Sequence, residues 1–308
     1  MQITNQVIEQ IAHKQGFNLV GFAKAEPVTA EFEKLNIWLQ NGYNADMQYM
    51  VRNREKRLDV RKILPSVKSV ISLGMNYFKR DENIEKKQGY KVSQYAWGRD
   101  YHLTIWDKLK TLLKELKTVD PSVELISYVD TGPVMDKVWA QRAGLGWIGK
   151  HSNLINREFG SWFFIANIFI NKELGYSATV PDHCGTCTKC IDACPTEAIV
   201  SEYIVDANKC ISYLTIENKG EIGNEFKGKF QDYVFGCDIC QDVCPWNLKF
   251  SLLSKNSFYM PLNNNNRITF EEINEMDEPE FNKRFAESPI KRAKLSGLRR
   301  NAVFLSEG

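Results

Sequence analysis

The sequence predicts an α+β protein made of three consecutive parts: a layered α/β domain over residues 1–178, a cysteine-rich domain over residues 179–250 and a short helical segment over residues 251–308. Three observations lead to this prediction. Strand-like and helix-like patterns alternate in the first part. Seven of the eight cysteines fall in two short runs of the second part, and the third combines the low-complexity run Asn263 to Asn266 with helix-like sequence.

The elements of the first part follow from the spacing of apolar residues and from the turn residues at their ends. Apolar residues at helical spacing predict helices, and short apolar runs bounded by turn residues predict strands. In chain order we expect a helix over residues 3–15, a strand over 18–25, a helix over 28–41, a strand over 66–78, a helix over 107–116, a strand over 123–130, a helix starting within 134–143 and a strand over 161–170. Strands separated by helices indicate a sheet covered by helical layers.

Composition limits the class of protein. With 308 residues, 25% of them charged and 43% hydrophobic, the chain is an ordinary globular protein with room for about two domains. The N-terminus has no apolar core of signal-peptide length, and the longest apolar run, residues 162–170, is far too short to cross a bilayer. We therefore expect a cytoplasmic protein without a membrane partner, in which disulfides are disfavoured.

The two cysteine runs have the spacing of iron–sulfur ligands. The first follows the bacterial ferredoxin pattern C-x2-C-x2-C-x3-C-P, and the second lacks one cysteine of that pattern, which only Cys210 can supply. In two-cluster ferredoxins the cysteine after the x3 step ligates the other cluster. The expected [4Fe–4S] ligand sets of a ferredoxin-like domain are Cys184, Cys187, Cys190 and Cys244, and Cys194, Cys210, Cys237 and Cys240. Zinc is the competing interpretation, although zinc sites usually use two separated CxxC pairs or mixtures of Cys and His.

Two neighbouring clusters form a path for single electrons, so a substrate or second cofactor must bind in another part of the chain. Asp130 ends a predicted strand, where α/β proteins place ligand sites, but it could equally be a turn residue or a helix N-cap. Asp136 could be an ordinary surface acid. The glycine-rich stretch 144–150 lacks the spacing of a phosphate-binding loop, and residues 95–102 read as a loop with buried rings. None of the four histidines has metal-ligand spacing.

Several segments together resemble the epoxyqueuosine reductase family. They are the cysteine pattern with VDTGPVMDKVWAQRAGLGWIGK, YAWGRDYH, EKRLD, NKCISYLTIE and CDICQDVCPWN, in order over about residues 1–250. The resemblance is specific because it rests on the combination. That family is distantly similar to the reductive dehalogenases. The resemblance implies two [4Fe–4S] clusters and a base-off cobalamin without a protein histidine on cobalt, bound between the first domain and the ferredoxin-like domain.

The resemblance also implies a reaction. The family reduces the epoxide of epoxyqueuosine, at the wobble position of tRNA, to the alkene of queuosine, the last step of queuosine biosynthesis. Its catalytic acid maps to Asp130, and its cobalamin contacts map to Arg57, Asp130, Leu154, Ile165 and Ser212. A small electron-donor protein or other reductant is expected to supply the clusters. Because an acid that protonates the opening epoxide oxygen needs a raised pKa, we expect burial against the corrin to raise the pKa of Asp130.

The C-terminal segment has an uneven charge although the net charge of the chain is only +2. Residues 271–280 are acidic and residues 281–300 are basic, so the two stretches could attract each other as solvated helix faces, or the second could bind a polyanion. Since the resemblance implies tRNA as a partner, we expect phosphate contacts from Lys291, Arg292, Lys294, Arg299 and Arg300. Many family members carry a C-terminal HEAT-like repeat that this sequence lacks, so part of the tRNA-binding surface is expected to be reduced or supplied differently.

Two other functions fit parts of the sequence. A cobalamin-dependent, reductive dehalogenase-like enzyme acting on a small molecule would use the same cofactors, and it predicts turnover of halogenated compounds without tRNA binding. A non-catalytic electron carrier would need only the cysteine-rich domain, and it predicts no cobalamin uptake. The size of the first domain and its loops rich in Gly, Trp and Asp argue against a carrier.

Overall fold

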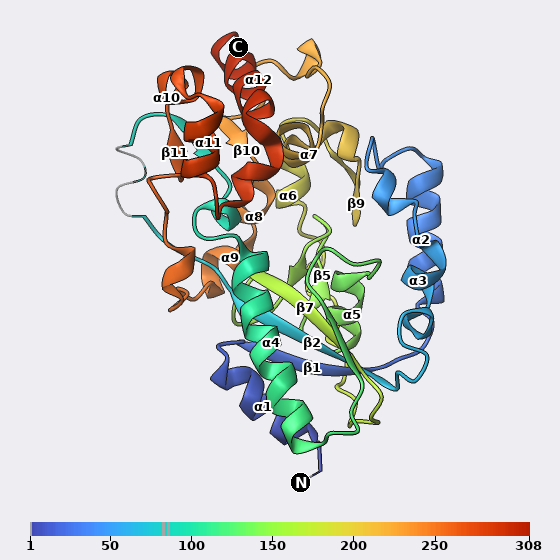
Figure 1. The fold of residues 1–308 in the computed structure, drawn as a ribbon. Coiled ribbons are helices and arrows are strands. Elements are labelled where there is room, and N and C mark those ends of the chain that lie inside the picture. The colour runs from blue at the N-terminus through green and yellow to red at the C-terminus, as the bar shows by residue number, and fades with distance from the viewer. Residues whose placement is uncertain (1, 82–83, 85–86) are drawn as a thin grey trace.

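The computed structural model describes residues 2–81, 84 and 87–308, and a four-stranded antiparallel sheet lies at its centre (Figure 1). The strands are ordered β1 (Leu19–Lys24), β2 (Ser69–Asn76), β7 (Phe163–Ile170) and β4 (Leu125–Tyr128). The inner strands β2 and β7 are buried along nearly their whole length, which accounts for the continuous apolar run in β7. The predicted α+β class is confirmed.

Helices cover both faces of this sheet. On one face lie α1 (Asn5–Lys14) and α4 (Tyr101–Val119), and on the other lies α5 (Asp136–Arg142), whose buried Trp139 packs against the sheet. Two further helices, α2 (Thr29–Gln40) and α3 (Arg54–Leu58), follow β1 in the chain. No helix in the described residues is both long enough and apolar enough to cross a membrane.

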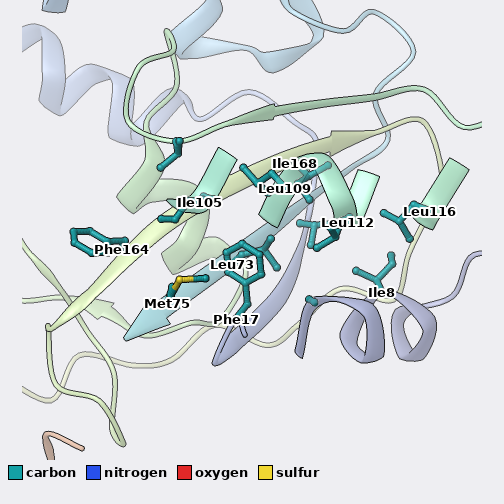
Figure 2. Packing of buried hydrophobic residues seen from close by; sticks show 14 of the residues in the cluster. Ile8, Phe17, Leu73, Met75, Ile105, Leu109, Leu112, Leu116, Phe164 and Ile168 are labelled. Atoms are coloured by element: carbon teal, nitrogen blue, oxygen red, sulfur yellow. The ribbon is translucent and has the colours of Figure 1, made fainter. Parts of the chain in front are cut away.

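The core under α4 follows from the spacing of its apolar residues. Ile105, Leu109, Leu112 and Leu116 are at most 1% exposed and pack on the sheet, as Figure 2 shows. The helix begins at Tyr101 rather than at residue 107 as predicted, because the Asp100 side chain accepts the backbone N–H of His102 and caps it. Tyr101 and His102, which were expected in a loop, therefore project from the first turn of a helix.

A second sheet joins all three predicted parts of the chain. Its strands are ordered β10 (Tyr233–Phe235), β3 (Tyr90–Val92) and β11 (Arg267–Ile268), with β10 parallel and β11 antiparallel to β3. The C-terminal helices α10 (Phe270–Glu275), α11 (Glu278–Arg284) and α12 (Lys294–Ser306) share one apolar core with this sheet. The segment 251–308 is mainly helical, as expected, and it also contributes the short strand β11, which pairs with a strand of the first part.

The cysteine-rich region is built from short elements. They are the helices α6 (Lys189–Asp192), α7 (Ile211–Ile216), α8 (Ile239–Asp242) and α9 (Pro245–Phe250), and the strand pair β8 (Ile199–Ser201) and β9 (Ile204–Val205). A further hairpin from the first part, β5 (Trp147–Ile148) with β6 (Leu154–Ile155), packs on Cys244. Short 3-10 helices are η1 (Gln48–Met50), η2 (Val60–Lys62), η4 (Gln94–Ala96), η5 (Ala207–Lys209), η6 (Asn224–Phe226), η7 (Ser257–Tyr259) and η8 (Pro289–Ala293).

Candidate active site and metal centres

A cavity of about 360 Å³ lies where the sheet meets the cysteine-rich region. It brings together three residues predicted from the sequence, Asp130, Leu154 and Ile165. The other lining residues are Tyr77, Tyr95, Tyr101, Asp136, Lys137, Asn153, Ser161, Phe163, Phe164 and Gln241. The walls therefore combine flat apolar surfaces with amide, hydroxyl and charged groups, a combination that is typical of cofactor sites.

Asp130 follows the end of β4 in the left-handed backbone conformation, with a φ of 56°. The Tyr101 hydroxyl donates to Asp130 Oδ2 at 2.6 Å, and His102 Nε2 lies 3.7 Å from the same oxygen. The helix N-cap interpretation of Asp130 is wrong, since α5 begins after Met135 and no side chain caps it. The Asp130 side chain is 67% exposed although protein atoms crowd the hollow around it, so a ligand in the cavity could reach it.

The surroundings set the charge of Asp130 and His102. Crowding raises the pKa of Asp130, but the contact with His102 and the hydrogen bond from Tyr101 outweigh it, so the pKa lies below its ordinary value. Burial lowers the pKa of His102, but its contacts with Asp100 and Asp130 outweigh the burial and raise the pKa to about 9. Asp100 Oδ1 lies 2.8 Å from His102 Nδ1 and orients the ring. At neutral pH the pair is therefore a carboxylate facing an imidazolium.

The raised pKa belongs to the neighbouring acid, Asp136. Burial, followed by the charge of Asp130, raises the pKa of Asp136 to about 7. Its Oδ1 accepts a hydrogen bond from Asn167 Nδ2 at 2.8 Å, and Ser72 donates to Asn167 Oδ1 at 2.6 Å. His102 and Tyr101 stabilise the charged form of Asp130 here, and the rise expected from burial of Asp130 against the corrin stays a prediction. Asp136 lines the cavity and is not a surface acid.

The two remaining predicted cobalamin positions do not line this cavity. Arg57 is 8% exposed and donates to Tyr49 O at 3.1 Å and to Val134 O at 3.4 Å, which ties η1 to the loop after Asp130. Its Nε is buried without a hydrogen-bond partner in the described residues, so it keeps a donor that a bound group could use. Ser212 lies on α7, close to Cys210.

A second cavity, of about 150 Å³, is lined by the first predicted cysteine set. Cys184, Cys187, Cys190 and Cys244 share its wall with Lys150, His151, Ile155, His183, Pro245 and Trp246. Burial raises the pKa of Cys190 to about 11, and the neighbouring Cys244, Cys184 and Cys187 add to the rise. Four thiolates this close to one another need a cationic group between them, so the donor set fits a metal cluster.

The second predicted set also converges. Burial raises the pKa of Cys240 well above its ordinary value, with Cys210 and Cys194 as the next contributors. Burial likewise raises the pKa of Cys237. A backbone hydrogen bond from Ile239 opposes this rise, and the charges of Cys240 and Cys210 add to it. None of the eight cysteines, all of which the structure describes, forms a disulfide.

The predicted basic contacts differ in what their side chains do. Lys291, Arg292 and Lys294 are exposed, and Arg292 also forms an ion pair with Glu217 at 2.8 Å. Arg299 donates instead to the backbone carbonyl of Asn274 at 3.1 Å, near the end of α10. Arg300 donates to three backbone carbonyls, Leu214 O at 2.9 Å, Asn218 O at 2.7 Å and Gly220 O at 2.8 Å, at the end of α7. These two arginines thus satisfy helix ends within the fold, which leaves few of their N–H groups for phosphate.

Three residues in the cavity or next to Asp130 were not singled out as site residues from the sequence. Tyr101 and His102 reach Asp130 because Asp100 caps α4, and an Asp two residues before a His was the signal available. Lys137 donates to Ser152 O and to Asn153 Oδ1, both at 2.9 Å. Burial lowers the pKa of Lys137, against the opposing charge of Asp130, and no pattern in the sequence pointed to it.

Comparison with protein-family models gives two matches along the chain. Residues 57–131 match the family described as epoxyqueuosine reductase QueG, DUF1730, and residues 183–247 match the 4Fe-4S double cluster binding domain. The first match ends just after Asp130. The second spans all eight cysteines, so the double-cluster domain is shown and zinc is not favoured.

Whole-length relatives and solved structures agree with these matches. The epoxyqueuosine reductase of Cellulophaga algicola is 46% identical over 301 residues, covering 98% of this chain and 97% of that protein. The epoxyqueuosine reductase of Leadbetterella byssophila is 46% identical over 307 residues, covering all of both chains. A crystal structure of an epoxyqueuosine reductase with an epoxyqueuosine-modified tRNA-Tyr stem loop has a TM-score of 0.92 and 28% identity, covering 97% of this chain and 80% of that one.

Proposed function

This chain belongs to the epoxyqueuosine reductase family, from which we infer that it reduces epoxyqueuosine to queuosine at the wobble position of tRNA. The whole-length identity to two such reductases carries this conclusion, since the match includes the Asp130 cavity and both cysteine sets. The reaction takes up two electrons and two protons per epoxide and releases its oxygen as water. A dehalogenase-like enzyme and a non-catalytic electron carrier are not favoured, and a cytoplasmic location stays a prediction.

The cysteines hold two [4Fe–4S] clusters in this proposal. Cys184, Cys187, Cys190 and Cys244 ligate the first cluster, and Cys194, Cys210, Cys237 and Cys240 ligate the second. The second set adjoins the active-site cavity, because Lys137 lies within the electrostatic reach of Asp130, Cys240 and Cys210. Electrons from a small donor protein or other reductant would therefore enter at the first cluster and leave from the second.

Cobalamin, in the base-off form and without a protein histidine on cobalt, is the proposed second cofactor, and when bound it supplies a strongly reducing metal that accepts electrons singly. The family resemblance suggests it, and side chains in and outside the cavity lining support it. Leu154 and Ile165 offer apolar surface in the cavity. Arg57 lies outside the lining, and its buried Nε is a donor without a partner among the described residues. The contact proposed for Ser212 rests on the resemblance alone.

The proton comes from the side chains around Asp130. His102 Nε2 faces Asp130 Oδ2, so a proton can pass from the imidazolium to the carboxylate and from there to the opening epoxide oxygen. Tyr101 holds the same oxygen in place, and Asp100 fixes the ring of His102. Asp136, with a pKa of about 7, is the other acid in reach and a candidate for the second proton.

The rate should fall on the alkaline side as His102 loses its proton. Below a pH of about 9 the imidazolium is present, and above that pH the rate should drop by about tenfold per pH unit. The pairing of His102 with Asp100 and Asp130 also stabilises the fold. This stabilisation is fully present below the ordinary pKa of histidine and is lost as the pH rises through about 9. Single-turnover rates across this range test the prediction.

The titration of His102 can be distinguished from that of the other ionisable groups that face the site. Asp136 would give its own change near pH 7, while the pKa of Tyr101 is raised by burial and then by Asp130. Replacing His102 by Gln should remove the alkaline limb and leave the change near pH 7. An unchanged limb in the His102→Gln variant would mean that another group holds the proton.

We place the tRNA contact at Lys291, Arg292 and Lys294, and we no longer assign phosphate contacts to Arg299 or Arg300. The first three side chains are exposed on or next to η8. Arg292 is also close enough to Asp130 and Tyr49 for their charges to raise its pKa, after the larger effect of Glu217. Arg292 therefore lies near the active site, where the wobble nucleotide must enter, and Lys291 and Lys294 are its neighbours in the chain.

Charge reversal at Lys291 and Lys294 should weaken tRNA binding through lost phosphate contacts. Each lost contact should also reduce the slope of log K against log salt by about 0.7 to 0.9. Binding of the stem loop by the Lys291→Glu and Lys294→Glu double variant, measured at several salt concentrations, tests this. The matched control reverses Lys110 and Lys114, which are exposed on α4, and it should bind normally. Equal weakening in both variants would indicate a general charge effect and remove η8 from the proposal.

Anaerobic reconstitution tests the function itself. The protein is loaded with iron, sulfide and cobalamin and assayed on tRNA from a strain blocked at epoxyqueuosine. Formation of queuosine in the tRNA is the expected result. Turnover of halogenated small molecules without activity on this tRNA would overturn the proposal, as would a protein that takes up no cobalamin.

A further inference from the structure

The glycine-rich stretch at residues 144–150 has no role in the reaction described above. It forms strand β5 of the hairpin with β6, and the turn is closed by Gly149 N–H donating to Asn153 O at 2.8 Å. Trp147 and Ile155 of this hairpin pack with Cys244. Two residues at the turn, Lys150 and His151, line the cavity of the first cysteine set. The hairpin is therefore a wall of the first metal centre.

His151 presents one N–H group to this cavity. Its Nδ1 accepts the backbone N–H of Asn153 at 3.1 Å, so the proton of a neutral ring must be on Nε2. The ring is neutral because burial, and then the charge of Lys137, lowers the pKa of His151 to about 4. The residue is only 4% exposed, and Nε2 is buried without a hydrogen-bond partner in the described residues. Such a donor needs an acceptor that the protein does not provide.

Trp147 adds a second donor on the same wall. Its indole is fully buried, packs against Cys184 and leaves Nε1 without a hydrogen-bond partner among the residues that the structure describes. The Trp147 ring centre lies 5.0 Å from that of His183 and 4.9 Å from that of Trp246, and both of these residues line the cavity. The open space beside these groups is the cavity that the four cysteines share.

We propose that His151 Nε2–H donates a hydrogen bond to the iron–sulfur cluster held by Cys184, Cys187, Cys190 and Cys244, with Trp147 Nε1–H as a second donor, and that this raises the reduction potential of that cluster. The proposal rests on the ligand sets of the proposed function. Reduction adds negative charge to a cluster, and a fixed N–H donor stabilises the reduced form more than the oxidised form. His151 is thus a positioning and tuning residue, not a ligand.

Replacing His151 by Phe keeps a ring at this position and removes the N–H donor, which tests this inference. His151→Phe should retain both clusters, while the equilibrium of one cluster shifts about tenfold toward the oxidised form, which is about 59 mV for one electron. EPR-monitored redox titration of the anaerobically reconstituted protein measures both potentials without any turnover. The other potential should stay as in the unmodified protein, and His151→Gln, which keeps an N–H donor, should restore most of the lost potential.

His183→Phe is the matched control, because His183 lines the same cavity but its Nε2 is already in contact with Arg157 at 2.5 Å. An equal shift in this variant would show that any change of the wall moves the potential, and would overturn the assignment.

If the His151 variants fail to fold, pulsed EPR of the unmodified protein with ¹⁵N-labelled histidine tests the same hydrogen bond. Coupling of the reduced cluster to a histidine N–H supports the proposal, and its absence overturns it. A protein that binds no iron would instead refute the proposed function.

Discussion

Replacing Asp130 by Asn is expected to lower the rate of epoxide reduction by about 10²- to 10⁴-fold, the range typical of a lost general acid. Asn has nearly the size of Asp, but it cannot take a proton from His102 and pass it to the substrate oxygen. The hydrogen bond from Tyr101, 2.6 Å long, can persist, so the loop should keep its position. Single-turnover conversion of epoxyqueuosine in tRNA measures the loss, while iron, cobalamin and tRNA binding should be unchanged.

Two further variants make this result specific. Glu115→Gln removes one carboxylate on α4 that pairs with Lys14 at 3.2 Å, and it should retain the full rate. Asp136→Asn tests the other acid of the cavity, and its loss should be smaller if Asp130 delivers the first proton. A fully active Asp130→Asn variant combined with an inactive Asp136→Asn variant would move the proton donor to Asp136.

Replacing Cys240 by Ala should abolish turnover, because in the proposed arrangement it removes the cluster that adjoins the active-site cavity and passes electrons to it. The iron content should fall from about eight to about four atoms per chain, since each [4Fe–4S] cluster contributes four. Iron and sulfide analysis together with EPR of the reduced protein checks this.

The companion variant is Cys187→Ala, which removes a ligand of the first set. It should also retain about four irons, but the remaining EPR signal should be that of the other cluster. Two different signals in the two variants are expected from the crossed ligand sets, in which Cys194 and Cys244 each belong with cysteines of the other run. A Cys240→Ala protein that keeps about eight irons would contradict this assignment.

Local patterns predicted much of this molecule. The leucine spacing of α4 gave its buried face, and the apolar run of residues 161–170 gave the central strand β7. The cysteine spacing depends on the geometry of a cluster more than on the surrounding fold, and the 4Fe-4S double cluster match covers the same residues. These signals are carried by neighbouring residues, so they can be read without tertiary structure.

Long-range contacts could not be predicted from local sequence patterns. Strands β3, β10 and β11 are two or three residues long and exist only because distant segments meet. The basic residues of the C-terminal segment had equal weight in the sequence, yet Arg299 and Arg300 bind backbone carbonyls, as the structure shows. The pKa of Asp130 likewise depends on partners from α4 that its own segment does not contain.

The sheet formed by β10, β3 and β11 also affects when the protein can fold during its synthesis. Cys237 follows β10 after Gly236, so a ligand of the second set is positioned by a strand whose partner, β3, also pairs with β11 near the C-terminal end. Strand β11 lies at residues 267–268, so the three strands can assemble only after the chain has been synthesised to that point. We therefore expect the second predicted ligand set to reach its final arrangement late in synthesis, after residues 267–268 have been made.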